Sequence, residues 1–459
     1  MDILMVSANR EPNPYPVFPL GLCYLAGPLE NHGHRLRVLD LLLAGDPLAA
    51  LEKALDDFRP GAVVISIRNI DNVTFPGSKS YLSGVQAVVQ HCRGRATVVV
   101  GGSGFSLMPV QLLAHLDADF GVVGEGEEIL PQLIARIEQG LTVDSLPGVL
   151  ARGMTDFLPA SLVRRIGPAD RTLFPVERYH LEGGMANLQT KRGCPFNCIY
   201  CIYPILEGKG VRLRPIVEIL AEIRALVDDH GANYLYFVDD IFNYPPEFAE
   251  ELCLAIVREG VKINWSAFIN PGFTSVSLFR AMAAAGCDAV EFGSESGSPR
   301  MLVNLGKSFG VEEIRGASKL CLDLGLDFGH YMLFGGPGES EETVDESFAL
   351  MDELTPSAVI AMTGIRIFPG TALHRQAMKD GVITRDTSLL EPVFYLAPAI
   401  RDTLCDMVAQ RALARKNWVA PGMEINMSDT MLEALRHFPV RGPSWKQLKR
   451  LGRSRVRPM

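Results

Sequence analysis

Three cysteines stand close together in the stretch KRGCPFNCIYC, at Cys194, Cys198 and Cys201. Thiols at such spacing hold a metal centre or form a redox disulfide. A structural zinc ion takes four ligands, usually as separated pairs, and no second pair of Cys or His follows here. An iron–sulfur cubane normally takes four thiolates, so three leave one iron open to a ligand that is not protein. The C-x3-C-x2-C spacing therefore predicts a [4Fe-4S] cluster, with zinc or a disulfide as the weaker alternative.

The other cysteines and the N-terminal stretch indicate the cellular compartment of the protein. Cys253 and Cys321 lie on apolar helical patterns, where a free cysteine behaves as a small hydrophobic residue, so we expect both in the core. The N-terminal MDILMVSANR lacks the basic region of a signal peptide, and no apolar run approaches the ~18 residues of a membrane span. These features predict a cytoplasmic protein whose cysteines are thiols or metal ligands.

The elements that position the chemistry begin with residues 1–140, where short apolar runs alternate with segments of helical periodicity. The runs are DILMVSA, RLRVLD, GAVVISI, ATVVVGG and DFGVVGEG. Five strands, each followed by a helix, predict a Rossmann-like domain with an open parallel sheet covered on both faces. Ligands of such sheets bind at the carboxyl ends of the strands.

Polar residues and paired glycines follow three of these strands. Glycines let the backbone approach a ligand closely, and the polar side chains offer contacts. The domain lacks both the G-x-G-x-x-G fingerprint and a G-x-x-x-x-G-K-S/T loop, which disfavours a nicotinamide or a nucleoside triphosphate. The candidate ligand-binding residues are Ser66, Arg68, Asn69, Gly101, Gly102, Ser103, Gly124, Glu125 and Gly126.

A connector rich in Pro, Gly and Arg covers residues 141–184, and a second alternation of strands and helices covers 185–375. The predicted strands are ANLQTKR, NYLYFVDD, KINWSAF, CDAVEFGSE, LDFGHYMLFGG and SAVIAMTGIRIFPG. Six β/α units predict a partial (β/α)6 barrel, whose active site would lie where the strands end. The three cysteines come directly after the first of these strands. Residues 376–459 form a short C-terminal region with a basic end.

The cysteine stretch, with an aromatic residue before its last cysteine, resembles the radical S-adenosylmethionine (SAM) superfamily. In that family SAM chelates the open iron, and an electron from the cluster cleaves the sulfonium to release a 5′-deoxyadenosyl radical. The resemblance implies further SAM contacts in YFVDDIFN, where the family often has Gly-Gly-Glu, and in EFGSESGS and LFGGPGES. The implied contact residues are Tyr200, Asp239 or Asp240, Ser294, Glu295, Gly335 and Gly336. Asp-Asp is also a helix cap and glycines also form turns, so each has a structural alternative.

The first domain resembles the cobalamin-binding module of the cobalamin-dependent radical SAM enzymes, which include phosphorus methylases, carbon methyltransferases and the anaerobic cyclase of bacteriochlorophyll synthesis. FPLGLCYLAGPLENHGHRLRVLD, GGSGFSLMP and VVGEGEE carry this resemblance. Residues 1–140 lack the Asp-x-His-x-x-Gly motif that supplies a lower axial histidine, and the Asp228-x-His230 pair lies elsewhere without the glycine. The resemblance thus implies cobalamin bound base-off, with Arg68 or Asn69 nearest cobalt. A plain surface loop is the alternative.

The resemblance implies a methyltransferase. A radical on an unactivated carbon cannot accept a methyl cation, so methylcobalamin would pass the methyl group of SAM to a carbon, or phosphorus, of a small metabolite. A flavodoxin- or ferredoxin-type protein would supply electrons. No protein acid or base is required, so no catalytic residue is named. His330 and Tyr331 on one predicted strand either reach substrate or are satisfied core residues, and the core is favoured.

Three other functions compete with methyl transfer. A cyclase or ring-rearranging enzyme would use the same cofactors without transferring a methyl group. A methylthiotransferase would need three more cluster cysteines, and residues 1–140 hold only Cys23 and Cys92. A cobalamin sensor would need neither the three cysteines nor a barrel. The cyclase is therefore the main alternative.

The charge distribution bears on partners. A net charge of −9 disfavours nucleic acid. The basic end is either a solvated tail or a contact to an anionic membrane surface or substrate. The apolar LLEPVFYLAPAI suits a wall for a hydrophobic substrate or a packed lid. The basic residues of the tail are Lys446, Lys449, Arg450, Arg453, Arg455 and Arg457.

Overall fold

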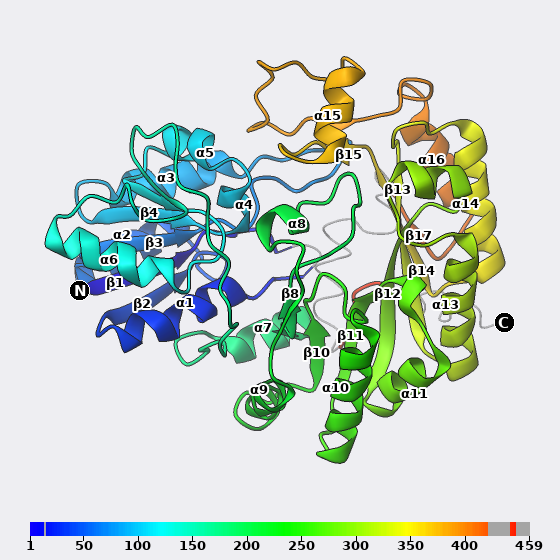
Figure 1. Cartoon of the computed structure of the whole chain (residues 1–459), viewed down its shortest axis with the longest axis horizontal. Helices are drawn as coiled ribbons and strands as arrows, with labels where there is room; N and C mark the ends of the chain where they lie inside the picture. Colours follow the sequence, from blue (N-terminus) through cyan, green and yellow to red (C-terminus); the bar gives the residue numbers. More distant parts are fainter. Residues whose placement is uncertain (13–14, 421–440, 447–459) are drawn as a thin grey trace.

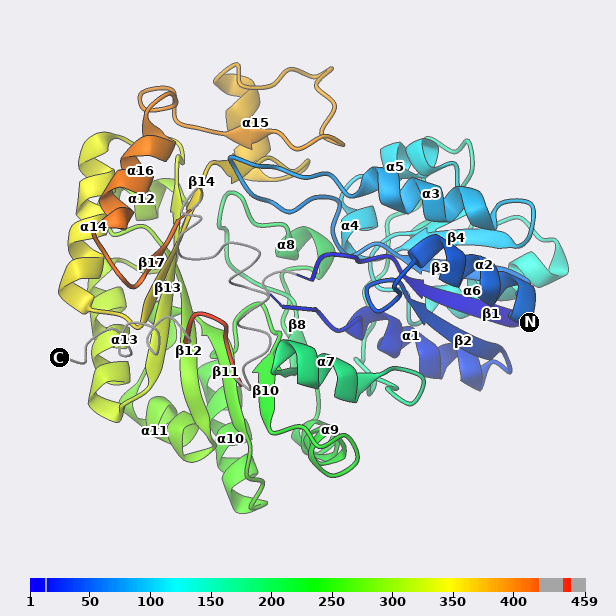
Figure 2. The same ribbon diagram turned by 180° about the vertical axis from the view of Figure 1, so that it is seen from behind.

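The computed structural model describes residues 1–12, 15–420 and 441–446. Two α/β domains lie side by side, the N-terminal one in blue to cyan and the barrel in green to yellow (Figure 1). Seen from behind, α8 (Tyr203–Leu206) still lies between the two domains (Figure 2). No described helix is long and apolar enough to cross a membrane.

The N-terminal domain is built on a six-stranded sheet in the order β2-β1-β3-β4-β5-β6. β1 to β5 are parallel, and β6 runs antiparallel to β5 at the edge. The central strands are apolar throughout because helices cover both faces of the sheet. The strands are β1 (Asp2–Ser7), β2 (Arg35–Asp40), β3 (Ala62–Ser66), β4 (Thr97–Gly101), β5 (Phe120–Val122) and β6 (Val149–Ala151).

The helices of this domain divide between the two faces. Alternate residues of β1 point to opposite sides. Ile3 packs into the core that contains residues of α1 and α6, and Leu4 into the core beneath α2, α3 and α5. The helices are α1 (Leu20–Asn31), α2 (Pro47–Phe58), α3 (Leu82–Cys92), α4 (Ser103–Ser106), α5 (Pro109–Leu116) and α6 (Ile129–Gln139). The predicted Rossmann-like sheet of five parallel strands is confirmed.

The sixth strand, β6, lies within 141–184, which the sequence predicted as a connector. It pairs with β5, whose edge would otherwise expose unpaired backbone groups. A three-residue strand carries too little periodicity to be recognised from sequence. The connector then leads into α7 (Val176–Gly183) and the barrel.

The barrel domain holds a seven-stranded parallel sheet in the order β17-β14-β13-β12-β11-β10-β7. The strands from β7 to β14 are the six predicted ones in sequential order, which confirms the partial barrel. β17 extends the sheet beside β14 and comes from the C-terminal region. The strands are β7 (Ala186–Leu188), β10 (Tyr234–Phe237), β11 (Asn264–Ile269), β12 (Cys287–Glu295), β13 (Asp327–Phe334), β14 (Ala358–Thr363) and β17 (Trp418–Val419).

Helices cover the outer face of this sheet (Figure 1). Cys253 on α10 and Cys321 on α13 are fully buried there, as expected. The helices that follow α8 in the chain, whether or not they cover this face, are α9 (Ile216–Asp228), α10 (Pro246–Arg258), the 3-10 turn η1 (Pro271–Phe273), α11 (Val276–Ala284), α12 (Pro299–Asn304), α13 (Val311–Leu324), α14 (Glu341–Leu354), α15 (Ala372–Lys379) and α16 (Leu404–Leu413). Two short ribbons pair β8 (Lys191–Arg192) with β9 (Arg212–Leu213) and β15 (Ile365–Arg366) with β16 (Phe394–Tyr395).

The C-terminal region is more than a tail. Phe394, Leu396 and Ile400 of the apolar LLEPVFYLAPAI segment pack into a core with Phe334 of β13, so the segment is a packed lid. Lys446, counted with the basic tail, forms an ion pair with Asp288 at 2.8 Å. The other basic residues of the tail lie outside the described residues.

The loop after β3 fastens one domain to the other. Asp71 forms a fully buried ion pair with Arg366 of β15, at 2.9 Å between Oδ2 and Nε. The hydroxyl group of Thr363 at the end of β14 donates to the carbonyl oxygen of Phe75 at 2.6 Å. These contacts hold the carboxyl end of β3 against the barrel.

Candidate active site between the two domains

The three cysteines lie on a loop between β8 and α8. Gly193 opens the loop with φ +96°, and a Cβ atom there would stand 2.3 Å from the carbonyl oxygen of Gly210, so only glycine fits. Its N–H donates to Oε2 of Glu207 at 3.0 Å, and the N–H of Cys194 donates to the carbonyl oxygen of Gly208 at 3.1 Å. The loop is therefore fixed against residues 207–210 before any ligand binds.

The thiols themselves are largely withdrawn from water. Cys194 is buried, and Cys198 and Cys201 are half-buried. Burial raises the pKa of Cys194 to about 11 and that of Cys201 to about 12, so ionised thiolates there need a compensating metal charge. Three thiolates on one loop match the protein ligands of a [4Fe-4S] cluster that keeps one iron open.

The two aspartates after β10 have different surroundings. Asp239 is buried and accepts hydrogen bonds from the N–H and hydroxyl groups of Thr190, at 2.6 and 2.5 Å, and from the N–H of Lys191. Asp240 instead leaves its Oδ2 buried without a hydrogen-bond partner among the described residues. Burial raises the pKa of Asp240, as do the charges of Glu207 and Asp239. Of the two candidates, Asp240 is the one that keeps a carboxylate oxygen without a partner among the described residues.

Tyr200 and Glu295 meet across the site. The hydroxyl group of Tyr200 donates to Oε1 of Glu295 at 2.8 Å, and the ammonium group of Lys307 lies 3.5 Å from the same oxygen. Glu295 has φ +64°, a strained conformation for a residue with a Cβ atom, where the β12–β13 register is irregular. Strain of this kind is typical of functional sites.

Ser294 does not join this group. Its hydroxyl group lies 2.7 Å from Nδ1 of His330, on the helix side of the sheet. His330 also contacts Ser318 of α13 at 3.2 Å, and burial lowers its pKa to about 3. His330 is thus a satisfied core residue, as favoured from the sequence. Tyr331, its neighbour, points the other way and hydrogen bonds to the buried Glu291.

Gly335 and Gly336 form a tight turn after β13. Gly335 has φ +104°, and its N–H donates to Oε2 of Glu339 at 3.1 Å. A Cβ atom at Gly335 would meet Leu404 at 2.9 Å, and one at Gly336 would meet Leu305 at 3.0 Å. Close packing therefore explains glycine at both positions, in line with the alternative that these glycines form a turn.

Loops of the N-terminal domain line the other side of the site. Gly102 has φ +98°, and its Cβ position would lie 2.7 Å from the carbonyl oxygen of Ile67, so the loops after β3 and β4 touch through glycine. The hydroxyl group of Ser103 donates to the carbonyl oxygen of Arg68 at 2.9 Å. Arg68 is exposed, and Ser66, Asn69 and Gly101 are half-buried. The structure thus brings Ser66, Arg68, Asn69, Gly101, Gly102 and Ser103 together.

The loop of Arg68 and the cysteine loop contribute to one hydrophobic core. Ile67, next to Arg68, is buried in this core, and Ile199 and Ile202, beside the cysteines, pack against it. Tyr203 follows the cysteine loop and is 47% exposed. Apolar side chains of both domains therefore meet at the loops that carry Arg68 and the cysteines.

Glu125, predicted as a ligand contact, is engaged by protein. Its Oε2 and Oε1 accept from Nη1 and Nη2 of Arg212 at 2.6 and 2.7 Å, and Oε1 lies 3.3 Å from Arg192. Gly124 and Gly126 on either side pack closely on Ala160 and Leu25, at 3.3 and 3.0 Å from their Cβ positions. This loop therefore joins the domains.

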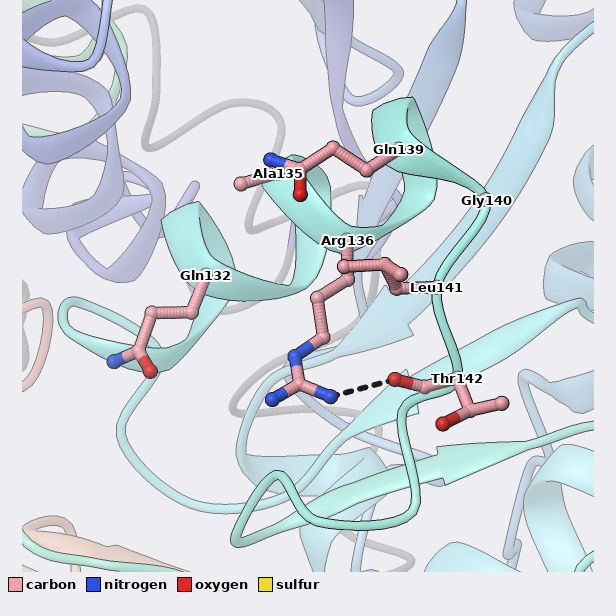
Figure 3. A pocket seen from close by; sticks show the side chains of 7 residues that line it. All are labelled: Gln132, Ala135, Arg136, Gln139, Gly140, Leu141 and Thr142. Atoms are coloured by element: carbon pink, nitrogen blue, oxygen red, sulfur yellow. Dashed lines mark hydrogen bonds between the residues drawn. The ribbon is translucent and has the colours of Figure 1, made fainter.

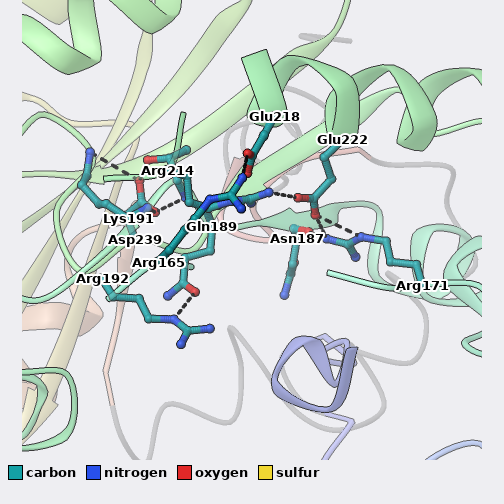
Figure 4. A network of polar contacts seen from close by, with 11 residues as sticks. Arg165, Arg171, Asn187, Gln189, Lys191, Arg192, Arg214, Glu218, Glu222 and Asp239 are labelled. Carbon is teal, nitrogen blue, oxygen red and sulfur yellow. Dashed lines mark hydrogen bonds and ion pairs between the residues drawn. The ribbon is translucent and has the colours of Figure 1, made fainter. Parts of the chain in front are cut away.

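A network of charged residues supports the start of the barrel (Figure 4). Arg171 and Arg214 reach Glu222 of α9, each at 2.7 Å, and all three side chains are at most 7% exposed. Arg171 also donates to the carbonyl oxygen of Asn187 in β7 at 2.6 Å. The strand that leads to the cysteine loop is thus fixed from its helix side.

A shallow depression lies at the end of α6, away from this site (Figure 3). Arg136 crosses it and donates to the carbonyl oxygen of Thr142 at 2.7 Å. Figure 1 places α6 at the outer edge of the N-terminal domain, and we assign the depression no role.

Comparisons with known proteins identify relatives of both domains. The B12 binding domain family matches residues 10–134, and the Radical SAM superfamily matches residues 188–351. An uncharacterized methyltransferase of Pyrococcus horikoshii is 26% identical over 390 residues, covering 82% of this chain and 83% of that protein. The tryptophan 2-C-methyltransferase of Streptomyces laurentii is 27% identical over 445 residues, covering 80% and 74%.

Among solved structures, the radical SAM methyltransferase TsrM from Kitasatospora setae, with tryptophan substrate and a SAM analogue bound, superimposes with a TM-score of 0.88. The alignment covers 99% of each chain at 22% identity, which shows a shared fold. The chain therefore carries a B12 binding domain followed by a Radical SAM domain, the pair of domains predicted from the sequence. The two family matches confirm the predicted enzyme class and its set of cofactors: the iron–sulfur cluster, SAM and cobalamin.

Several residues of the site were missed from the sequence. Arg192 and Arg212 stand near the cysteines but carry no motif, and Lys307 lies in an ordinary helix-to-loop stretch. Glu291 and Trp445 are separated by 154 positions in the chain yet hydrogen bond to each other. No local signal marks such pairs.

Proposed function

We propose that this chain transfers a methyl group from SAM, by way of cobalamin, to a carbon or phosphorus atom of a small metabolite. The proposal rests on the family assignment and on the curated relatives, which include a tryptophan C-methyltransferase. A flavodoxin- or ferredoxin-type electron donor and a cytoplasmic location remain predictions.

The observation that carries the proposal is the hydrophobic core shared by the loop of Arg68 and the cysteine loop. Ile67 of the N-terminal domain is buried in this core, and Ile199 and Ile202 of the cysteine loop pack against it. A cluster site and the predicted cobalamin site must face each other if one methyl group is to pass from SAM to cobalamin and then to substrate. The core shared by the two loops supports this arrangement.

Residues of this chain supply binding and orientation. Cys194, Cys198 and Cys201 would hold the cluster, and Asp240 would receive the ammonium group of SAM. Arg68 and Asn69 would face the lower side of the corrin. When bound, the cluster supplies the electron that cleaves SAM, and cobalamin carries the methyl group.

Two interdomain ion pairs hold the domains together. Asp71 pairs with Arg366, and Glu125 pairs with Arg212. Catalysis depends on groups that are held in a fixed relative orientation. The chain's own ion pairs would therefore serve the chemistry by fixing the domains.

SAM with a deuterated methyl group tests the proposal. Protein loaded anaerobically with cluster and cobalamin should transfer the label to cobalamin, and then to a metabolite that accumulates in a deletion strain. Label that never reaches cobalamin would overturn the proposal. A product that is cyclised and carries no label would assign the cyclase reaction instead.

A further inference from the structure

One carboxylate inside the barrel has no role in the proposed reaction. Glu291 lies in the middle of β12 and is 4% exposed. Lys, Arg and His residues form no ion pair with it within the described part of the chain. A buried charge without a cationic partner is unusual, because removal from water is costly unless the charge is paired.

Three donors converge on Glu291. The indole N–H of Trp445 donates to Oε1 at 2.8 Å, and the hydroxyl group of Tyr236 donates to Oε2 at 2.9 Å. Tyr331 adds a third hydrogen bond. A carboxylate offers about four acceptor positions, so about one is left for a further donor. In these hydrogen bonds the Glu291 carboxylate is the acceptor.

Aromatic rings surround the carboxylate. Tyr236 packs with Phe268 and Tyr15, and the rings of Phe268 and Tyr331 lie 5.1 Å apart. Phe268 and Tyr331 are half-buried, so part of each of these two residues is exposed. This aromatic sleeve consists of Tyr15, Tyr236, Phe268, Tyr331 and Trp445.

The sleeve reaches the N-terminal domain. Burial raises the pKa of Tyr15, the charge of Glu291 raises it further, and the charge of Arg68 lowers it. Tyr15 belongs to the N-terminal domain and packs against the cluster that contains Tyr236 of the barrel. The sleeve therefore contains side chains of both domains.

Trp445 forms the floor of the sleeve. Its ring packs on Ala289 and Ala358, and a Cβ atom at Gly329 would lie 3.2 Å from it, so small residues leave the space it fills. Lys446 next to it pairs with Asp288. The indole is thus held in place, and its N–H fixes the orientation of Glu291.

We propose that Glu291 and its aromatic sleeve bind a protonated amine, so the methyl acceptor is an organic ammonium compound. This inference rests on the proposed function. A cation completes the acceptor set and pairs the buried charge, and aromatic faces attract cations, as in the aromatic cages that bind ammonium groups. The rival is a protonated, purely structural Glu291, which burial favours by raising its pKa.

Three small probes of similar shape distinguish these possibilities. Phenethylamine, 3-phenylpropionate and 2-phenylethanol are titrated calorimetrically into protein loaded with cluster and cobalamin. The amine should bind at least about tenfold more tightly than the other two, as expected for one charged hydrogen bond in a buried site. Equal binding of all three, or no binding of the amine, would overturn the proposal.

Variants assign the preference to Glu291. Glu291→Gln keeps the shape and should abolish the preference for the amine, whereas Glu353→Gln removes an exposed surface charge and should retain it. A preference that survives in Glu291→Gln would contradict the proposal. Cobalamin content reports whether the variant is folded.

A second variant covers the case in which Glu291→Gln does not fold. Phe268→Leu keeps the carboxylate and removes one aromatic wall, so phenethylamine binding should weaken several-fold while 2-phenylethanol binding changes little. Equal losses for both probes would count against a cation site. Labelling of cobalamin by SAM is measured on the same wild-type samples and needs no acceptor, so failure of the proposed function is recognised separately.

Discussion

Glu125 and Arg212 form a two-point ion pair across the domain interface, at 2.6 and 2.7 Å. Their side chains are 6% and 17% exposed. Arg212 also donates to the carbonyl oxygen of Glu207, whose carboxylate accepts from Gly193 at the start of the cysteine loop. One continuous chain of contacts thus links the N-terminal domain to the cluster ligands.

Removing Glu125 should therefore loosen the interface. Glu125→Ala leaves Arg212 buried without its main partner, and breaking a buried pair in this way costs about 3–5 kcal/mol. Urea unfolding and limited proteolysis within 141–184 would measure the change. Arg165→Ala breaks an ion pair with Glu218 in which Arg165 is 71% exposed, and should cost no more than about 1 kcal/mol. Equal effects of the two variants would contradict the prediction.

Substitutions of the two aspartates after β10 should have different effects, one on SAM binding and the other on protein stability. Asp240→Asn should weaken SAM binding by about 10- to 100-fold, the value of one charged hydrogen bond, and leave unfolding unchanged. Asp239→Asn should instead lower the unfolding free energy by about 1–3 kcal/mol, because it accepts three hydrogen bonds from Thr190 and Lys191. Calorimetry with SAM and urea titration are the two measurements. The reverse assignment would show that Asp239 is the ligand.

The iron content of the reconstituted protein should depend on Cys194, Cys198 and Cys201 and not on Cys253 or Cys321. The triple variant of Cys194, Cys198 and Cys201 to Ala should lose the iron, the inorganic sulfide and the charge-transfer absorption of the reconstituted protein. Cys253→Ala and Cys321→Ala should keep all three and lose only about 1–3 kcal/mol of packing, because both are fully buried away from the loop. Iron retained by the triple variant would show that other residues hold the cluster.

The barrel should lose stability on acidification through His330. Its pKa is lowered by burial to about 3, against an ordinary value of about 6.5. A lowered pKa means that the neutral form is favoured in the folded state, so its stabilisation is present above pH about 6.5 and is lost as the pH falls toward 3. Between these limits the unfolding free energy should fall by about 1.4 kcal/mol per pH unit from this group. His330→Gln should have a shallower pH profile, measured by urea unfolding at each pH, and an unchanged slope would refute the assignment.

The sequence by itself determined the order of the elements and the kind of chemistry. β-rich runs and helical periodicity are local properties, so β1–β5, β7 and β10–β14 followed from them. The spacing of Cys194, Cys198 and Cys201 on one loop likewise needed no long-range information. Short elements without periodicity were beyond this approach, as β6 and β17 show.

Only the tertiary structure decided which side chains face the site. Ser294 and Glu295 are adjacent in sequence, yet one contacts His330 beneath the helices and the other meets Tyr200 above the barrel. Asp239 and Asp240 are likewise adjacent but differ in their contacts. Asp239 accepts a hydrogen bond from Lys191 of β8, whereas Oδ2 of Asp240 has no partner among the described residues. Neighbouring residues of a strand point to opposite faces, and which face holds the ligand depends on register and packing. Trp445 reaches Glu291 from another part of the chain, and such pairings depend on how the domains close rather than on any local pattern.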